Sequence, residues 1–195
     1  MLDRIYAAIA GWTEGEEKEI GSLPGGPGPT RILPHSSVEA LAGMLEHLNE
    51  GAGVHDIYKL DEELGAEMTD LVATIEMAEI LGFAQVFSGD IRITPLGQTF
   101  AEASILTRKE VFATRARCLP MIRWMMDMLR AAPDNKLPLK VFYTALLLEF
   151  PDEVAERQLD IAIDWGRYAE LISYDDSTET LSLDVHERVN VRVPA

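Results

Sequence analysis

Histidine and cysteine are the residues of this sequence whose side chains most readily bind metals or act as nucleophiles. The four histidines are His35, His47, His55 and His186. Their spacings match no compact metal-ligand pattern, and the single cysteine, Cys118, has no cysteine companion for zinc. The apolar residues that follow Cys118 indicate burial, which disfavours a reactive thiolate. We therefore expect no metal site and no catalytic cysteine.

Acidic pairs and glycine-rich loops are the other features that could support catalysis. Asp175 and Asp176 are adjacent, but acidic residues are so frequent that close pairs arise from composition alone, and this pair lies in a predicted hairpin turn. The glycine-rich stretch from Gly21 to Gly28 is interrupted by prolines and lacks the lysine of a phosphate-binding loop. The sequence does not supply a nucleophile, a base and an orienting group that would together form an active site. We therefore predict a non-catalytic chain without a cofactor.

Composition restricts the protein to a few classes. Its 195 residues are 47% hydrophobic, which suffices for one domain or two small ones without a metal or disulfide staple. The sequence shows neither a secretion signal nor an apolar stretch near the roughly 20 residues that a spanning helix needs. We expect a cytoplasmic protein that does not insert into a membrane. Its net charge of −16 makes nucleic acid an unfavourable partner.

The N-terminal region changes composition twice. Residues 1–10 place apolar side chains at helical spacing, which predicts a short amphipathic helix. Residues 11–34 are first charged and then rich in glycine and proline, a composition typical of a flexible linker. A domain boundary is therefore expected near Pro34.

Residues 35–104 carry the start and stop signals of three helices. The expected helices span residues 36–49, 57–64 and 70–81. Ser36 and Glu39 form a capping-box pattern, while Asp56 and Thr69 are the predicted N-caps of the second and third helices. Glycines follow the second and third helices and are expected to end them.

A hairpin is expected directly after the third helix. Residues 83–87 and 91–93 predict two short strands around a tight Ser88-Gly-Asp90 turn, and Thr94 before a proline predicts the start of the next helix. Three helices followed by a hairpin is the order of a winged helix. Residues 35–104 are therefore predicted to form a first winged-helix-like unit.

The second half of the chain repeats these signals behind a long helix. A helix is expected over residues 105–131, bent near Pro120, so that residues 105–132 are a connecting helix. Within residues 133–184, the expected helices are 137–150 and 151–166 and the expected strands are 171–174 and 181–183. The predicted fold is thus mainly α with small β-hairpins (α+β), as two winged-helix-like units joined by a long helix. Residues 185–195 are a tail without an assigned role.

Two segments suggest an internal repeat. Residues 78–87 and 164–173 each pass from a helix through a glycine, Gly82 or Gly166, into a strand. This pattern indicates a duplicated unit. Because helix, glycine and strand are common neighbours, chance similarity stays an equally open alternative.

The charges of the first unit argue against DNA binding. Residues 70–81, the predicted third helix, contain three acidic residues and no basic residue. From Ser36 to Ser104, thirteen acidic residues stand against two basic ones, which gives a net charge of −11. A DNA backbone would be repelled, so we expect no nucleic-acid partner.

The predicted connecting helix is basic instead. Its arginines at seven- and eight-residue spacing are Arg108, Arg115, Arg123 and Arg130. On one continuous helix this spacing keeps the four side chains on the same face. The face is a candidate interaction surface, and a solvated stripe on an amphipathic helix is the open alternative.

Several strings of residues resemble one family. They are Leu33-Pro-His35, Gly89-Asp-Ile-Arg-Ile-Thr-Pro-Leu-Gly97, Ala101-Glu-Ala with Arg108-Lys109, and Asp164-Trp-Gly-Arg-Tyr-Ala-Glu170 with Tyr174-Asp-Asp176. Over residues 33–184 the sequence thereby resembles the AAA-associated C-terminal domain. That domain is appended to the ATP-binding subunits of prokaryotic ABC importers of the nitrate, sulfonate, taurine and bicarbonate type.

The resemblance implies a non-catalytic accessory or regulatory role that acts through protein–protein contacts. The implied partners are the ABC transporter ATPase core, a sister domain or a second copy in a homodimer. It also implies that residues 1–10 end a preceding ATPase domain and that the protein lies at the periphery of the inner membrane. It supplies no catalytic, cofactor or metal residue. A free-standing winged-helix transcription regulator is the alternative, and an enzyme is the least favoured hypothesis.

Overall fold

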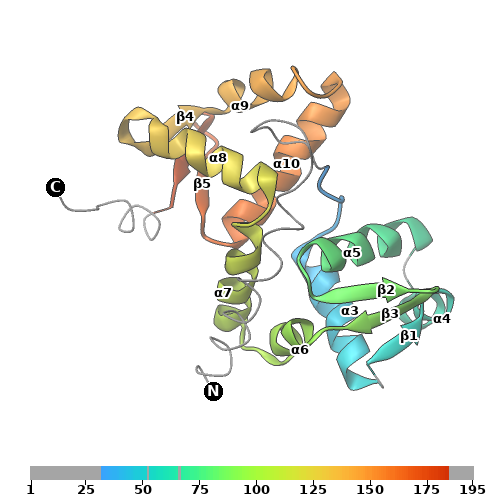
Figure 1. The fold of residues 1–195 in the computed structure, drawn as a ribbon. Helices are drawn as coiled ribbons and strands as arrows, with labels where there is room; N and C mark the ends of the chain where they lie inside the picture. Colours follow the sequence, from blue (N-terminus) through green and yellow to red (C-terminus); the bar gives the residue numbers. More distant parts are fainter. Residues whose placement is uncertain (1–31, 52, 66, 185–195) are drawn as a thin grey trace. The chain divides into compact units, whose positions relative to one another are not determined.

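The computed structural model describes residues 32–51, 53–65 and 67–184, which form helices and two small antiparallel sheets (Figure 1). The predicted helix over residues 1–10, most of the predicted linker 11–34 and the tail 185–195 lie outside the described residues. The expectation of a mainly α fold with small β elements is confirmed. Among the described helices, none combines the length and the apolar character needed to cross a bilayer.

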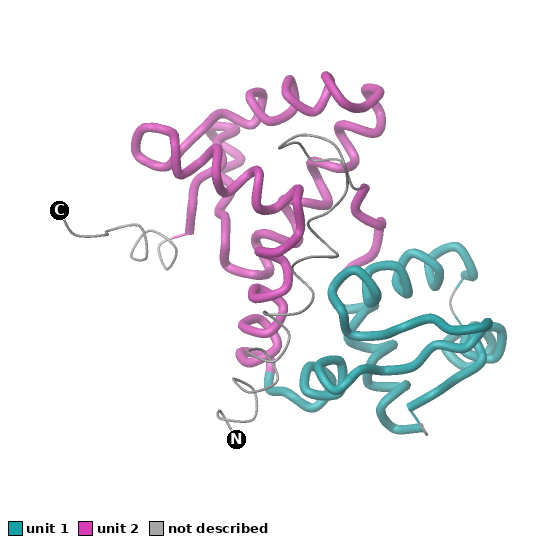
Figure 2. The backbone as a smooth tube through the Cα atoms, in the orientation of Figure 1, with its two compact units in different colours: residues 1–26, 39–104 teal, residues 27–38, 105–195 magenta. Residues whose placement is uncertain are grey.

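The described residues divide into two compact units, which Figure 2 distinguishes by colour. Unit 1 comprises residues 39–104, and unit 2 comprises residues 105–184 together with residues 32–38. We call residues 32–38 the leading segment. Unit 2 is therefore built from two stretches of chain that lie on either side of unit 1 in the sequence.

Unit 1 is a set of helices around a three-stranded antiparallel sheet. In chain order its elements are α3 (Val38–Glu50), β1 (Val54–Asp56), α4 (Ile57–Leu64), α5 (Met68–Ile80), β2 (Ala84–Phe87), β3 (Asp90–Ile93) and α6 (Pro95–Glu102). The strand order is β1-β3-β2. The predicted hairpin of β2 and β3 is confirmed. Strand β1, which pairs with β3, was not predicted, because three residues carry too little of an alternating pattern.

Local capping signals set the starts of two helices in unit 1. The Asp56 carboxylate accepts hydrogen bonds from the backbone N–H groups of Tyr58 and Lys59 at 3.0 and 3.2 Å, which confirms it as the N-cap of α4. Thr94 caps α6 by accepting from the Gly97 N–H at 3.0 Å. The predicted cap at Thr69 is wrong: α5 begins at Met68 and has no side-chain cap.

The start of α3 also differs from the prediction. The helix begins at Val38, two residues after the predicted start at Ser36. The Ser36 carbonyl instead accepts a hydrogen bond from the Trp165 indole at 3.1 Å. The backbone of Ser36 is thus held in the leading segment by Trp165.

The core of unit 1 is apolar and closely packed. The α3 residues Leu41, Leu45 and Leu48 are fully buried, as their helical spacing predicts. Phe83 and Phe100 stack with ring centroids 4.8 Å apart. At Gly97, a Cβ would overlap the Phe83 carbonyl oxygen, so only glycine lets α6 approach the backbone this closely.

Unit 2 has a second three-stranded antiparallel sheet. Its elements are α7 (Ile105–Ala116), α8 (Pro120–Ala131), the short 3-10 helix η1 (Pro133–Asn135), β4 (Lys136–Pro138), α9 (Leu139–Leu146), α10 (Asp152–Tyr168), β5 (Ile172–Asp175) and β6 (Thr180–Leu183). The strand order is β4-β6-β5. The predicted helix 137–150 is wrong at both ends, because residues 136–138 pair with β6 as a strand and α9 ends at Leu146.

The predicted long connecting helix is two separate helices. Helix α7 ends at Ala116 and α8 begins at Pro120, and Figure 1 shows them running in different directions. Proline has no backbone N–H and its ring clashes with a preceding helical turn, so it fits the first turn of α8 but not the interior of one long helix. The expected bend is therefore a complete break.

The two units share one order of elements. Each runs from a helix to a strand, two helices and a hairpin, with the first strand paired to the last. The ends of α5 and α10 make the same hydrogen bond, from Phe83 N–H to the Ala78 carbonyl (2.8 Å) and from Leu171 N–H to the Gly166 carbonyl (2.9 Å). The internal similarity suggested by the sequence thus extends to topology and hydrogen bonding.

Gly82 and Gly166 do not occupy equivalent positions in the two units. Gly82, which follows α5 with φ 74°, has Glu170 with φ 54° as its counterpart, because both lie one residue before the Phe83 and Leu171 N–H donors. Gly166 lies inside α10 and corresponds to Ala78. Its role is close packing, since a Cβ there would overlap the side chain of Ile172.

Candidate functional site

The leading segment is fastened to α10 by a buried glutamine. The Leu33 N–H donates to Gln158 Oε1 at 2.6 Å, and Gln158 Nε2 donates to the Leu33 carbonyl at 2.9 Å. Gln158 is only 2% exposed, and Leu33 is equally buried. A buried amide that satisfies both backbone groups of one residue fixes the position of the segment, because leaving either group unpaired is costly.

Aromatic residues support the same face of α10. The Trp165 indole, which donates to Ser36, lies edge-on to Phe112 of α7 with ring centroids 6.0 Å apart. Tyr168 contacts the same Phe112 ring at 5.2 Å, again edge-on. Trp165 is buried in the core, and Tyr168 is half-buried. Helix α10 thus holds both the leading segment and α7.

An ion pair joins α7 to the end of α10. Lys109 Nζ donates to Glu170 Oε1 at 2.7 Å, and this hydrogen bond, with the charge of Glu170, raises the pKa of Lys109. Glu170 adopts the left-handed conformation that glycine occupies at the counterpart position in unit 1. Glu170, whose backbone is strained, is therefore also the residue that makes the ion pair with α7.

The four arginines of the candidate interaction face do not share one helix. Arg108 and Arg115 lie on α7, and Arg123 and Arg130 lie on α8, so the seven-residue spacing keeps each pair together but not all four. Arg123 and Arg130 are exposed, and Arg130 pairs with Asp127 at 2.8 Å. Their use as an interaction face stays a prediction, now for two separate pairs.

Exposed apolar side chains occur in both units. In unit 1, Tyr58 is 76% exposed at the start of α4 and Phe87 is 72% exposed at the end of β2. In unit 2, Ile105 and Leu106 are exposed at the start of α7, and Leu148 is 84% exposed after α9. Exposed large apolar residues that gather into patches are typical of contact sites for other proteins.

The exposed sides of α5 and α10 are mainly acidic. On α5 the exposed residues include Asp70, Glu76 and Glu79. On α10, Asp160 is close enough to Asp164 that partial burial, together with that neighbouring charge, raises the pKa of Asp160. This negative charge would repel the phosphate backbone of a DNA duplex.

The candidate nucleophile and the acidic pair have ordinary structural surroundings. Cys118 is half-buried, and its Sγ donates to the Thr114 carbonyl at 3.6 Å. Asp175 accepts from the backbone N–H and the hydroxyl of Ser177 at 2.9 and 2.6 Å, which lowers the pKa of Asp175. The predicted turn is confirmed for Asp176, whereas Asp175 is the last residue of β5 and pairs with Thr180.

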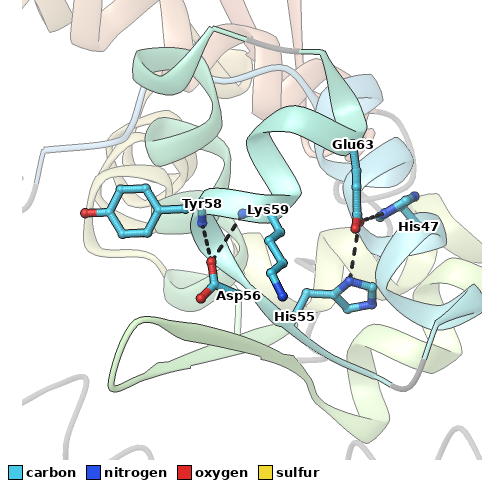
Figure 3. Close-up of polar contacts among 6 residues, drawn as sticks. All are labelled: His47, His55, Asp56, Tyr58, Lys59 and Glu63. Carbon is cyan, nitrogen blue, oxygen red and sulfur yellow. Dashed lines mark hydrogen bonds and ion pairs between the residues drawn. The ribbon is translucent and has the colours of Figure 1, made fainter.

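The structure brings together three polar residues that sequence spacing did not connect. His47 Nε2 lies 2.8 Å from Glu63 Oε2, and His55 Nδ1 lies 3.7 Å from the same oxygen (Figure 3). The hydrogen bond with His47 lowers the pKa of Glu63. We call these residues the His–Glu cluster. The histidine spacing alone gave no signal, since the ligand atoms come from the end of α3, from β1 and from the end of α4.

Comparison with known proteins agrees with the residues that carry the resemblance. The sequence signature of the C-terminal AAA-associated domain matches residues 58–175, which is more than half of the chain. Searches of curated proteins and of solved structures return no significant match. The family is one of accessory domains and is not itself catalytic. The chain therefore belongs to the C-terminal AAA-associated domain family.

Proposed function

We propose that this chain is the regulatory C-terminal part of an ABC importer ATP-binding subunit of the nitrate, sulfonate, taurine or bicarbonate type. In this proposal it acts through protein–protein contacts, lies in the cytoplasm at the periphery of the inner membrane, and follows an ATPase domain whose end is residues 1–10. Each unit is winged-helix-like but serves as a contact module. The family match over residues 58–175 is the observation that carries the proposal.

The attachment of the leading segment supports a regulatory role. In the proposed subunit, the chain from the ATPase domain reaches Leu33, which is fixed to Gln158 of α10 by two buried hydrogen bonds. A movement of the linker would therefore be transmitted to α10. From α10 it would reach α7 through the contacts of Trp165 and Lys109. This path gives the ATPase and the accessory units a physical connection.

Regulation of this kind requires a preference for one state. A tethered domain changes transport only if it binds one nucleotide state of the ATPase more tightly than another. A difference of about 1.4 kcal/mol in that contact changes the ratio of the states tenfold. The exposed apolar residues and the arginine pairs of α7 and α8 are the proposed contacts, with the ATPase core, a sister domain or a second copy as partner.

ATP hydrolysis by the full subunit, with and without residues 33–195, tests the proposal. We expect removal to change the hydrolysis rate or transporter assembly, and Gln158→Leu to reproduce part of that change by releasing the leading segment. Asp70→Leu, at the counterpart position of α5, is the matched control and should leave both unchanged. Unchanged hydrolysis and assembly after removal would contradict regulation. An immunoblot band no larger than 21.6 kDa in the source cells would contradict attachment to an ATPase.

The alternative is a free-standing winged-helix transcription regulator. The order of helix, strand, two helices and hairpin in each unit favours it. The absence of basic residues from α5 opposes it, because a reading helix needs donors for base edges and phosphates. Salt-dependent retention of the chain on duplex DNA would support the regulator, and no retention at low salt would exclude it.

A further inference from the structure

The His–Glu cluster has the composition of a metal-binding site. Its three ligand atoms all lie within 4.8 Å of one another, and they belong to two imidazoles and one carboxylate. Two histidines and one carboxylate form a ligand set that zinc and neighbouring transition metals accept. Around a tetrahedral ion with bond lengths of about 2.0–2.1 Å, ligand atoms stand about 3.3 Å apart, so small side-chain rotations would suffice.

The His55 ring is incompletely satisfied by the protein. Its Nδ1 faces Glu63 at 3.7 Å, beyond the distance of a direct hydrogen bond. Its Nε2 is buried and has no hydrogen-bond partner among the residues that the structure describes. The ring nevertheless holds a defined position, because it lies against Gly51, where any Cβ would overlap the imidazole. An ion beside Nδ1 would give that nitrogen the strong interaction that Glu63, at 3.7 Å, does not provide.

The surroundings favour a cation. Unit 1 carries thirteen acidic residues and two basic residues, which gives a net charge of −11. Glu63 is exposed and His47 is half-buried, so solvent and an ion can reach the cluster from outside. Figure 3 shows Tyr58 directed away from the cluster, so its exposed ring does not cover the entrance.

We propose that His47, His55 and Glu63 bind one divalent transition-metal ion, with zinc as the best-fitting example. The ion would join the end of α3, strand β1 and the end of α4, and would leave at least one coordination position open to water. The site goes beyond the proposed regulatory function and does not depend on it. The competing explanation is a hydrogen-bonded cluster in which Glu63 accepts from His47 and no metal binds.

Calorimetric titration of the untagged, metal-free 195-residue chain with zinc distinguishes the two explanations. We expect one ion per chain, and a dissociation constant at least about tenfold weaker for His47→Ala, His55→Ala and Glu63→Gln. Glu63→Gln preserves the volume of the side chain and a hydrogen bond to His47, so it tests the ligand without emptying the site. Circular dichroism of each metal-free variant verifies that it is folded.

Two controls and one independent readout complete the test. His35→Ala removes an exposed imidazole outside the cluster, and Glu62→Gln removes the neighbouring exposed carboxylate; both should bind zinc like the wild type. Zinc should also shift the imidazole nitrogen resonances of His47 and His55 but not those of His35. The proposal is overturned if the wild type binds no zinc, if the three cluster variants bind it equally well, or if only the His35 resonances respond.

Discussion

Units 1 and 2 build the same backbone from different residues. At the left-handed position after the long helix, unit 1 has Gly82 and unit 2 has Glu170. At the last turn residue before the third strand, the carbonyls of Gly89 and Glu179 accept a hydrogen bond from the first residue of the short helix that follows the first strand, which is Ile57 of α4 or Leu139 of α9. Glycine adopts the left-handed conformation of these turns without strain. Glutamate is strained in that conformation, but its side chain can make a further contact. In unit 2 the Glu170 side chain binds Lys109.

The two units also differ in the sizes of the side chains at the position where the long helix packs against the hairpin. In unit 1 the helix residue is Ala78 and the strand residue is Ala84, whereas in unit 2 the counterparts are Gly166 and Ile172. A larger strand residue is thus accompanied by the loss of the helix side chain. The missing side chain at Gly166 leaves room for the larger Ile172, as a close-packed interior requires.

The largest expected effect concerns this Gly166–Ile172 contact. Gly166→Ala should cost about 1–3 kcal/mol through overlap with Ile172, and Ile172→Ala about 2–5 kcal/mol through a cavity. The double variant, which carries the residues of unit 1, should cost less than the sum of the two. Urea unfolding followed by tryptophan fluorescence measures this, since Trp124 and Trp165 lie in unit 2. Additive costs would show that the two positions do not compensate each other.

A smaller loss is expected when the leading segment is released. Gln158→Leu leaves the N–H and the carbonyl of Leu33 without their buried partner and should cost about 2–3 kcal/mol. The counterpart in unit 1, Asp70, is exposed, so Asp70→Leu should cost less than about 1 kcal/mol. Amide hydrogen exchange at Leu33 should accelerate only in the first variant. Equal exchange in both would mean that Gln158 does not hold the segment.

Exchanging the left-handed residues should change stability in opposite directions in the two units. Gly82→Ala should destabilise unit 1 by about 1–2 kcal/mol, because a Cβ is unfavourable at φ 74°. Glu179→Gly should stabilise unit 2 by about 1 kcal/mol, because it relieves the strain at φ 47°. Thermal unfolding of both variants gives the comparison. If both variants changed the stability in the same direction, backbone strain would be excluded as the cause of the difference between the units.

The smallest effect is the pH dependence of the Lys109–Glu170 pair, which unit 1 lacks at Gly82. The folded-state pKa of Lys109 is raised above 10.5, so the pair stabilises the fold below that pH and loses its effect as pH rises through the higher folded value. The melting-temperature difference between wild type and Lys109→Met should therefore shrink above about pH 10.5. Lys109→Arg is the control that keeps the charge. A constant difference would indicate lost packing rather than lost charge.

Local signals predicted much of this fold, and distant contacts account for what was missed. Asp56 and Thr94 define helix starts within four residues of themselves, so their sequence neighbourhood sufficed. Strands β1 and β4 have three residues each and exist because β3 and β6 pair with them. The His–Glu cluster likewise depends on the ends of α3 and α4 and strand β1 being brought together, which no residue pattern encodes alone. Leu33 and Gln158 are 125 positions apart.

That separation bears on how the protein is made. Unit 1 lies between the two parts of unit 2, so all of its residues emerge from the ribosome before Gln158 does. At a synthesis rate of about 5–20 residues per second, the 125 positions between Leu33 and Gln158 correspond to a delay of about 6–25 s. Unit 1 has its complete sequence once Ser104 is made, before that delay ends, while the leading segment still has no α10 to bind. We therefore expect unit 1 to fold first on the ribosome and unit 2 to close last.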